Sequence, residues 1–302
     1  MKLLIPRCLL ISIFLSVLLV ACGGGGDSSS SSSSSTTPAS TVNLATPAGT
    51  PCLTSTKSTD VFGNTNYMVS HTIKASTWGC LLVNKSDGQP VFDGNQSVRF
   101  EIRPGDCNAS NSYDDCVNNR SRWELMSNGT QDKSTQGQVI TYQYYIYIPT
   151  QPLIRPATRA GVHGNDTVMT CLTQLNWFSR TGADHSILTG LYVDEVGGLF
   201  IRTNKDFDQL VTGQRVTIDN SPYDKWIKMT YVIKSTTAAD GYIKIYANDK
   251  LITNETRATL PDLNSTTLLK IGIYNGSLSF SAQPWQTQVV YFDGISTTVT
   301  NF

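Results

Sequence analysis

The sequence predicts an all-β protein of the β-sandwich or jelly-roll class. Many short stretches alternate apolar and polar residues with a period of two, and turn-forming residues separate them. We find no long amphipathic helix and no internal repeat in the sequence. The 302 residues are 39% hydrophobic and 15% charged with a formal net charge of zero, which excludes a collagen-like or fully disordered chain. This balance provides no general cationic field, so we expect no nucleic acid partner.

The expected strands follow one another from about residue 45 onward. In the stretch 97–103, Val98, Phe100 and Ile102 alternate with polar residues and therefore share one face. The other expected strands cover 120–125, 139–148, 168–178, 187–193, 199–203, 215–219, 226–234, 242–247, 268–274 and 289–295. The turn-like separators are 195–198, 247–250, 275–276 and 293–294. Because no second linker interrupts this series, we expect a single domain over 45–302.

Residues 1–22 have the pattern of a targeting segment. Lys2 and Arg7 form a basic start, and the apolar stretch 9–20 is short for a membrane span. The segment ends in Leu-Val-Ala-Cys, which resembles the lipobox of bacterial lipoproteins, and this resemblance implies that Cys22 is lipidated and becomes the first residue. The alternative interpretation is an ordinary signal peptide with a chance cysteine.

Segment 23–44 is expected to be a disordered linker. The glycines Gly23–Gly26 and the serine run Ser28–Ser35 cannot bury enough apolar surface to offset the entropy of ordering the chain. Gly23 after the lipidated cysteine resembles the outer-membrane sorting pattern. We therefore expect a protein of the bacterial cell envelope, attached to the outer membrane by lipid alone, with its folded domain periplasmic or extracellular.

Five cysteines remain once Cys8 of the leader and the anchor are set aside. An exported protein meets an oxidising compartment, so disulfides are expected between Cys107 and Cys116 and between Cys52 and Cys80. Cys171 is then left over among apolar residues, which suggests a buried free thiol. The sequence has no Cys-x-x-Cys or histidine-rich spacing, which argues against a zinc site.

Three of the expected strands place polar and charged residues on one face and apolar residues on the other. The polar faces consist of Arg120, Arg122 and Glu124 in the first strand, Gln174 and Asn176 in the second, and Lys270, Gly272 and Tyr274 in the third. One interpretation is an ordinary solvent-facing side of an antiparallel sheet. The other is a shared binding face, because cations and amides together can hold an anion.

Several stretches resemble jelly-roll polysaccharide lyases of the heparin lyase I and glucuronan lyase kind. They are Arg-Ser-Arg-Trp-Glu at 120–124 after the strand 99–107, Tyr-Asp-Lys-Trp at 223–226, Lys-Ile-Gly-Ile-Tyr at 270–274, and Val-Tyr-Phe-Asp-Gly at 290–294. Alginate lyases of the same architecture carry similar elements. The resemblance covers roughly residues 90–296 and implies a concanavalin-like β-jelly-roll sandwich. It also implies a lyase that cleaves a uronic-acid-containing glycan by β-elimination.

The resemblance also implies roles for individual residues. Arg122 corresponds to the arginine that binds the uronate carboxylate, helped by Gln174, and Tyr274 corresponds to the catalytic tyrosine, preceded by Lys270. Asn176 stands where the family has histidine; an amide can hydrogen-bond the carboxylate but cannot accept a proton. Cations near Tyr274, namely Lys270 and Arg122, are expected to lower its pKa so that it acts as base and then as acid.

The missing histidine leaves several alternatives open. His163 or His185 could fill the vacancy from a loop, Tyr274 could perform both proton transfers, or the protein could be inactive; His71 is the remaining histidine. Arg120, Glu124 and Trp226 are candidate substrate-binding residues. Trp177 and Trp285 are further candidate sugar platforms, although the face of Trp177 assigns it to the core.

Other chemistries and functions fit the sequence less well. A glycosidase needs two suitably spaced carboxylates, and the pair at 194–195 lies in an expected hairpin turn. A serine hydrolase would need a Gly-x-Ser-x-Gly elbow, which the sequence lacks. The competing functions are a non-catalytic glycan-binding surface lipoprotein of the same fold and a structural or adhesive lipoprotein.

The expected partner is an anionic uronate polysaccharide, and the expected state is a monomer without a cofactor. A structural Ca²⁺ ion is compatible with the resemblance, but the spacing of the acidic residues is not diagnostic of such a site. The residues that could contribute to it are Asp106, Asp114, Asp115 and Asp293.

Overall fold

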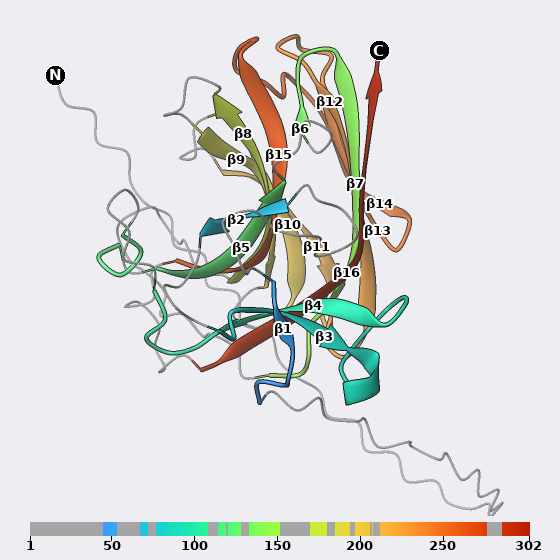
Figure 1. Ribbon diagram of the computed structural model, residues 1–302. Coiled ribbons are helices and arrows are strands. Elements are labelled where there is room, and N and C mark those ends of the chain that lie inside the picture. Colours follow the sequence, from blue (N-terminus) through green and yellow to red (C-terminus); the bar gives the residue numbers. More distant parts are fainter. Residues whose placement is uncertain are drawn as a thin grey trace, which may run out of the picture. The chain divides into compact units, whose positions relative to one another are not determined.

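Two β-sheets packed face to face make up the folded part of the chain (Figure 1). The computed structural model describes residues 45–52, 67–71, 77–107, 114–118, 120–127, 133–151, 170–179, 185–193, 197–205, 207, 212–276 and 286–302. All strand pairs in both sheets are antiparallel. The predicted jelly-roll sandwich is therefore confirmed.

The first sheet, here called the β7 sheet, has the strand order β1-β3-β4-β16-β7-β12-β13-β14. Its strands are β1 (Thr50–Pro51), β3 (Cys80–Asn84), β4 (Gln96–Ile102), β7 (Gln138–Tyr147), β12 (Trp226–Ser235), β13 (Tyr242–Ala247), β14 (Lys250–Thr256) and β16 (Gln288–Asn301). One turn of 3-10 helix, η1 (Lys85–Asp87), follows β3.

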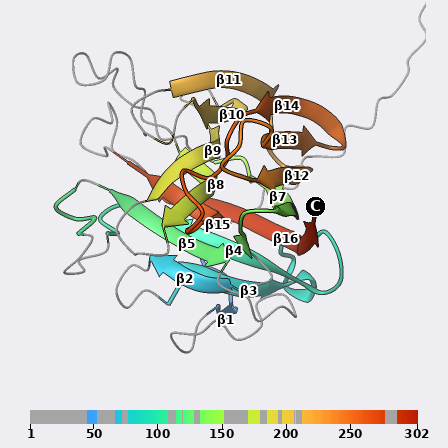
Figure 2. The same ribbon diagram turned by 90° about the horizontal axis from the view of Figure 1, so that it is seen from above.

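The second sheet, here called the β8 sheet, has the strand order β11-β10-β9-β8-β15-β5-β2. Its strands are β2 (Tyr67–His71), β5 (Ser121–Ser127), β8 (Thr170–Ser179), β9 (His185–Val193), β10 (Leu199–Asn204), β11 (Thr212–Asp219) and β15 (Ser265–Asn275), and the short β6 (Lys133–Ser134) also pairs with β15. Seen from above, β8, β15 and β5 lie in the middle of this sheet (Figure 2).

Alternate residues of both sheets fill the space between them. Along β12, every second residue from Ile227 to Ile233 is buried in the main apolar cluster, which also includes Leu175 and Ile271 of the β8 sheet. Trp177 belongs to this cluster as well, so its predicted place in the core is confirmed. The interior face of each strand is thus occupied by packing, and only the opposite face is available for a binding site.

The hairpin signal at 247–250 is confirmed, whereas the one at 293–294 is wrong. Asn248 and Asp249 both have positive φ (48° and 66°), as a two-residue turn between β13 and β14 requires. Asp293 and Gly294 lie inside β16, where the register to β7 shifts and Gly294 has φ 56°. These residues therefore form a β-bulge, which uses the same backbone conformation as a turn without reversing the chain.

The predicted disulfides and the predicted free thiol are confirmed. Cys52–Cys80 and Cys107–Cys116 form disulfides. Cys171 is a buried free thiol, and burial raises its pKa far above the usual range, so it stays protonated. Within the described ranges, no helix is long and apolar enough to span a bilayer.

Candidate active site

Three neighbouring strands of the β8 sheet bring together polar residues that the sequence singled out. Tyr274 of β15 lies opposite Arg122 of β5, and Lys270 lies opposite Gln174 of β8. Directly paired residues project from the same side of a sheet, and Ile273 between them lies in the core, so these side chains face away from it. We call the following residues the polar cluster: Arg122, Glu124, Gln174, Asn176, Lys270 and Tyr274.

Gly272 lets β15 and β5 approach each other closely. It has φ 145°, and a Cβ atom there would lie 2.1 Å from the backbone oxygen of Trp123 and 2.9 Å from the Cα of Glu124. The register of β15 against β8 also shifts between Ile271 and Tyr274. The Lys-x-Gly-x-Tyr spacing thus has a physical basis. Lys270 and Tyr274 of the polar cluster flank position 272, and only glycine fits there.

Arg122 is held by the buried carboxylate of Asp115, which the sequence offered only as one of several residues that could contribute to a calcium site. Its Nε donates to Asp115 Oδ2 at 2.8 Å and its Nη2 donates to Oδ1, while Nη1 lies 3.8 Å from Glu124 Oε2. Burial alone would lower the pKa of Arg122, but the hydrogen bond to Asp115 and the charge of Glu124 raise it above its ordinary value. The guanidinium is therefore charged and fixed in orientation.

Glu124 lies between the two cations and an amide. Gln174 Nε2 donates to Glu124 Oε1 at 2.9 Å. Burial raises the pKa of the Glu124 carboxyl, against the opposing charges of Lys270 and Arg122. Burial likewise lowers the pKa of Lys270, against the charge of Glu124. Glu124 therefore stabilises the arrangement of its neighbours from within the cluster.

Tyr274 is the partly exposed member of the polar cluster, and all other members are buried. The Arg122 guanidinium lies 4.7 Å from the centre of its ring. Burial raises the pKa of Tyr274, although the charges of Arg120 and Arg122 oppose the rise. Arg122 thus acts on this pKa in the expected direction, but the expected net lowering is wrong, because desolvation of the phenolate outweighs the attraction of the cations.

Asn176 brings an amide without a hydrogen-bond partner to this face. Asn176 is 1% exposed, and its Nδ2 has no hydrogen-bond partner within the described part of the chain. A buried amide donor without a partner costs free energy, which a hydrogen bond to a ligand would recover. Among the histidines, the backbone of His71 pairs with Glu124 and that of His185 with Phe178, whereas His163 lies outside the described residues.

Two of the remaining candidates occupy different places. Arg120 directly precedes β5, and its charge acts on Tyr274. Trp226 does not join the polar cluster: it lies on the outer face of the β7 sheet, where its ring centre is 5.4 Å from that of Tyr147. The twofold alternation in the sequence assigns a residue to a face but does not tell which sheet the strand joins. Trp285 lies outside the described residues.

The polar face continues across the β8 sheet beyond the predicted residues. A cross-strand row runs through Lys270, Gln174, Gly190, Arg202 and Arg215. A parallel row runs through Arg122, Tyr274, Cys171, Tyr192 and Phe200. The Arg215 guanidinium lies 3.9 Å from the centre of the Phe200 ring. The alternation within 187–193 and 199–203 indicates which face of the strand these residues occupy. Which residues lie beside them on the neighbouring strands depends on the order of the strands in the sheet.

The aspartates considered for calcium make separate contacts. Asp106 accepts hydrogen bonds from Arg103 N and Trp78 Nε1, and Asp293 accepts from the backbone of residues 92 and 93. Asp114 accepts from Val117 N. No group of three or more histidine, cysteine or acidic residues suited to a metal ion occurs among the residues that the structure describes.

Comparison with known proteins agrees with the fold. A family model described as polysaccharide lyase matches residues 76–296. Endo-β-1,4-glucuronan lyase from the fungus Trichoderma reesei is similar in structure, with a TM-score of 0.52, 16% identity, and coverage of 78% of this chain and 94% of that chain. Alginate lyase AlyC3 has a TM-score of 0.51 at 10% identity, covering 83% and 96%. No curated protein matches the sequence.

Proposed function

Because the chain belongs to the polysaccharide lyase family, we propose that its substrate is a uronic-acid-containing polysaccharide, which it cleaves by β-elimination. The observation that carries this proposal is the convergence of Arg122, Lys270 and Tyr274 on one face of the β8 sheet, together with the amides of Gln174 and Asn176. Cations and amide donors bind a carboxylate, and a phenol beside them can transfer a proton.

Neutralisation of the uronate carboxylate is the first requirement of this chemistry. The hydrogen on C5 becomes acidic only if the negative charge that develops in the neighbouring carboxylate is stabilised. In the proposal, Arg122 offers its Nη1 to that carboxylate and Asn176 offers its unpartnered Nδ2. Both donors are buried, so each interaction is stronger than it would be in water.

Tyr274 is the proposed acid and base. It removes the C5 proton as phenolate; the electron pair forms the C4–C5 double bond as the bond from C4 to the glycosidic oxygen breaks. The same phenol then donates its proton to the departing oxygen, so one residue balances both transfers. The raised pKa of Tyr274 keeps the phenol protonated in the free enzyme at neutral pH, so the rate depends on a small fraction of phenolate.

The row of residues across the β8 sheet supports a polymeric substrate that crosses the strands. Neighbouring strands are about 4.8 Å apart, so Arg202, three strands from Lys270, is offset from it by roughly 14 Å at the backbone. The sugar units of a 1,4-linked pyranose chain repeat at an interval similar to the spacing between neighbouring strands. In the proposal, Arg202 and Arg215 hold carboxylates of sugars about three units from the cleaved bond.

Ultraviolet absorbance of the unsaturated uronate product tests the proposal. The purified protein is incubated with alginate, glucuronan and a heparin-like polymer, in parallel with Tyr274→Phe. Absorbance that grows with wild type and is lost in the variant supports the lyase. Binding without product by the wild type would support the glycan-binding alternative and contradict the proposal. His71→Ala, His163→Ala and His185→Ala extend the test, since loss of activity in one of them would assign the base to that histidine.

We also propose that the protein is anchored by lipid on Cys22 in a bacterial envelope, from the Leu-Val-Ala-Cys sequence and the serine-rich linker. Metabolic labelling with a fatty acid tests this. Label in the wild type that is absent from Cys22→Ser supports the anchor, and an unlabelled, secreted wild-type protein contradicts it.

A further inference from the structure

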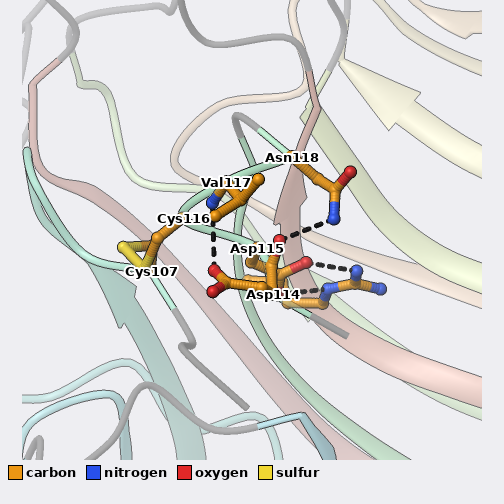
Figure 3. The surroundings of a disulfide bond; sticks show 7 residues. Cys107, Asp114, Asp115, Cys116, Val117 and Asn118 are labelled. Carbon is orange, nitrogen blue, oxygen red and sulfur yellow. Dashed lines mark hydrogen bonds and ion pairs between the residues drawn. A yellow bond between two sulfur atoms is a disulfide. The ribbon is translucent and has the colours of Figure 1, made fainter. Parts of the chain in front are cut away.

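The loop before β5 contacts Arg122 through Asp115, and further bonds fix the backbone around Asp115. Asp115 is 1% exposed and binds the Nε and Nη2 edge of the Arg122 guanidinium. Its backbone oxygen accepts from Arg120 N at 2.8 Å. The next residue, Cys116, is joined to Cys107 by a disulfide with a Cα–Cα distance of 5.0 Å (Figure 3). The backbone that carries this carboxylate is thus fixed by the hydrogen bond from Arg120 and by the disulfide.

Asp114 closes the turn that carries Asp115. The Asp114 backbone oxygen accepts from Asn118 N at 3.0 Å and its side chain accepts from Val117 N at 3.0 Å. These contacts fix the backbone on which Asp115 and Cys116 sit. The disulfide and the turn together present one carboxylate to one guanidinium.

The contact decides which edge of the guanidinium is available. With Nε and Nη2 bound to Asp115, only Nη1 points elsewhere, and it lies 3.8 Å from Glu124. Without Asp115, the second carboxylate that faces the guanidinium is Glu124, and a paired geometry with it would draw Arg122 off the Tyr274 ring, where it now lies 4.7 Å from the centre. Asp115 therefore opposes the attraction of Glu124 and keeps the guanidinium over the Tyr274 ring.

We propose that Asp115, held by the Cys107–Cys116 disulfide, is a positioning residue that orients Arg122 for the developing negative charge of the uronate. This role rests on the proposed lyase function. Because the charge on the carboxylate grows in the transition state, loss of orientation lowers kcat more than it raises KM. A misplaced guanidinium lowers the rate on the order of tenfold to a hundredfold.

Asp115→Asn is the principal test, because asparagine keeps the shape but accepts only one of the two hydrogen bonds. We expect kcat to fall on the order of tenfold to a hundredfold with KM within about threefold of wild type, and Asp115→Glu to recover part of the loss. Asp219→Asn is the matched control, since Asp219 pairs with Lys225 at 2.7 Å far along the sheet, and it should leave kcat unchanged.

The double variant Cys107→Ser with Cys116→Ser is a second, independent test, with Cys52→Ser and Cys80→Ser as the matched disulfide control. Rates are expressed per folded molecule, measured by near-ultraviolet circular dichroism. The first pair should lower kcat and the second should not. If the wild type is active, either of two results overturns the positioning role alone. One is an unchanged kcat in Asp115→Asn, and the other is an equal loss of kcat in the two double cysteine variants. A wild type without product refutes the lyase function, and the positioning role falls with it.

Discussion

Replacement of Gly272 by alanine tests why the Lys-x-Gly-x-Tyr stretch contains glycine. Its φ of 145° costs a residue with a Cβ about 1–3 kcal/mol. The new atom would also meet Trp123 O at 2.1 Å and the Cα of Glu124 at 2.9 Å, which are backbone atoms of β5 and cannot rotate away. Overpacking of this kind adds about 1–3 kcal/mol. Gly272→Ala should therefore lower the free energy of unfolding by about 2–6 kcal/mol.

Gly88→Ala is the matched control for this prediction. Gly88 also has positive φ (73°), but nothing lies within 4 Å of its Cβ position. Alanine there should cost only about 1 kcal/mol from the backbone conformation. Urea denaturation followed by tryptophan fluorescence measures both variants, and Gly272→Ala should also lose activity at temperatures where it is folded, since β15 must move away from β5. A difference of less than about 1 kcal/mol between the variants would refute the close-approach argument.

Further outcomes concern the chemistry and the substrate. The raised pKa of Tyr274 predicts that kcat/KM rises close to tenfold per pH unit from pH 7 to about 9, whereas a plateau starting near pH 7 would indicate a histidine base. Tyr274→Phe should lower kcat on the order of a thousandfold in steady-state assays. Arg202→Ala with Arg215→Ala should raise KM for the polymer but not for a trisaccharide; equal effects on both would contradict the extended site. Glu124→Gln removes the buried negative charge that acts on Lys270 and Arg122 and should cost about 3–5 kcal/mol in urea denaturation, and a loss under about 1 kcal/mol would contradict a stabilising role of that charge.

Much of this fold could be predicted from local pattern, because the side-chain period of a strand depends only on the backbone. The stretch 268–274 shows this: Leu269, Ile271 and Ile273 lie in the core and Lys270 and Tyr274 lie outside, as alternation predicts. The same reasoning missed the two-residue strands β1 and β6, the five-residue strands β2 and β3, and β14, which carries weaker alternation. It also mistook the bulge at Gly294 for a turn, because both need positive φ.

What the amino-acid sequence determined by itself is therefore the face of each residue and the residue types available for chemistry. Tertiary structure decided which faces meet: it brought Asp115 from a disulfide-linked loop to Arg122 and placed Trp226 on the other sheet. It also decided the direction in which the pKa of Tyr274 shifts, because burial depends on what surrounds the phenol in space and not on its neighbours in the chain. The physical reason is that alternation has a range of a few residues, whereas register, strand order and desolvation arise from segments far apart in the chain.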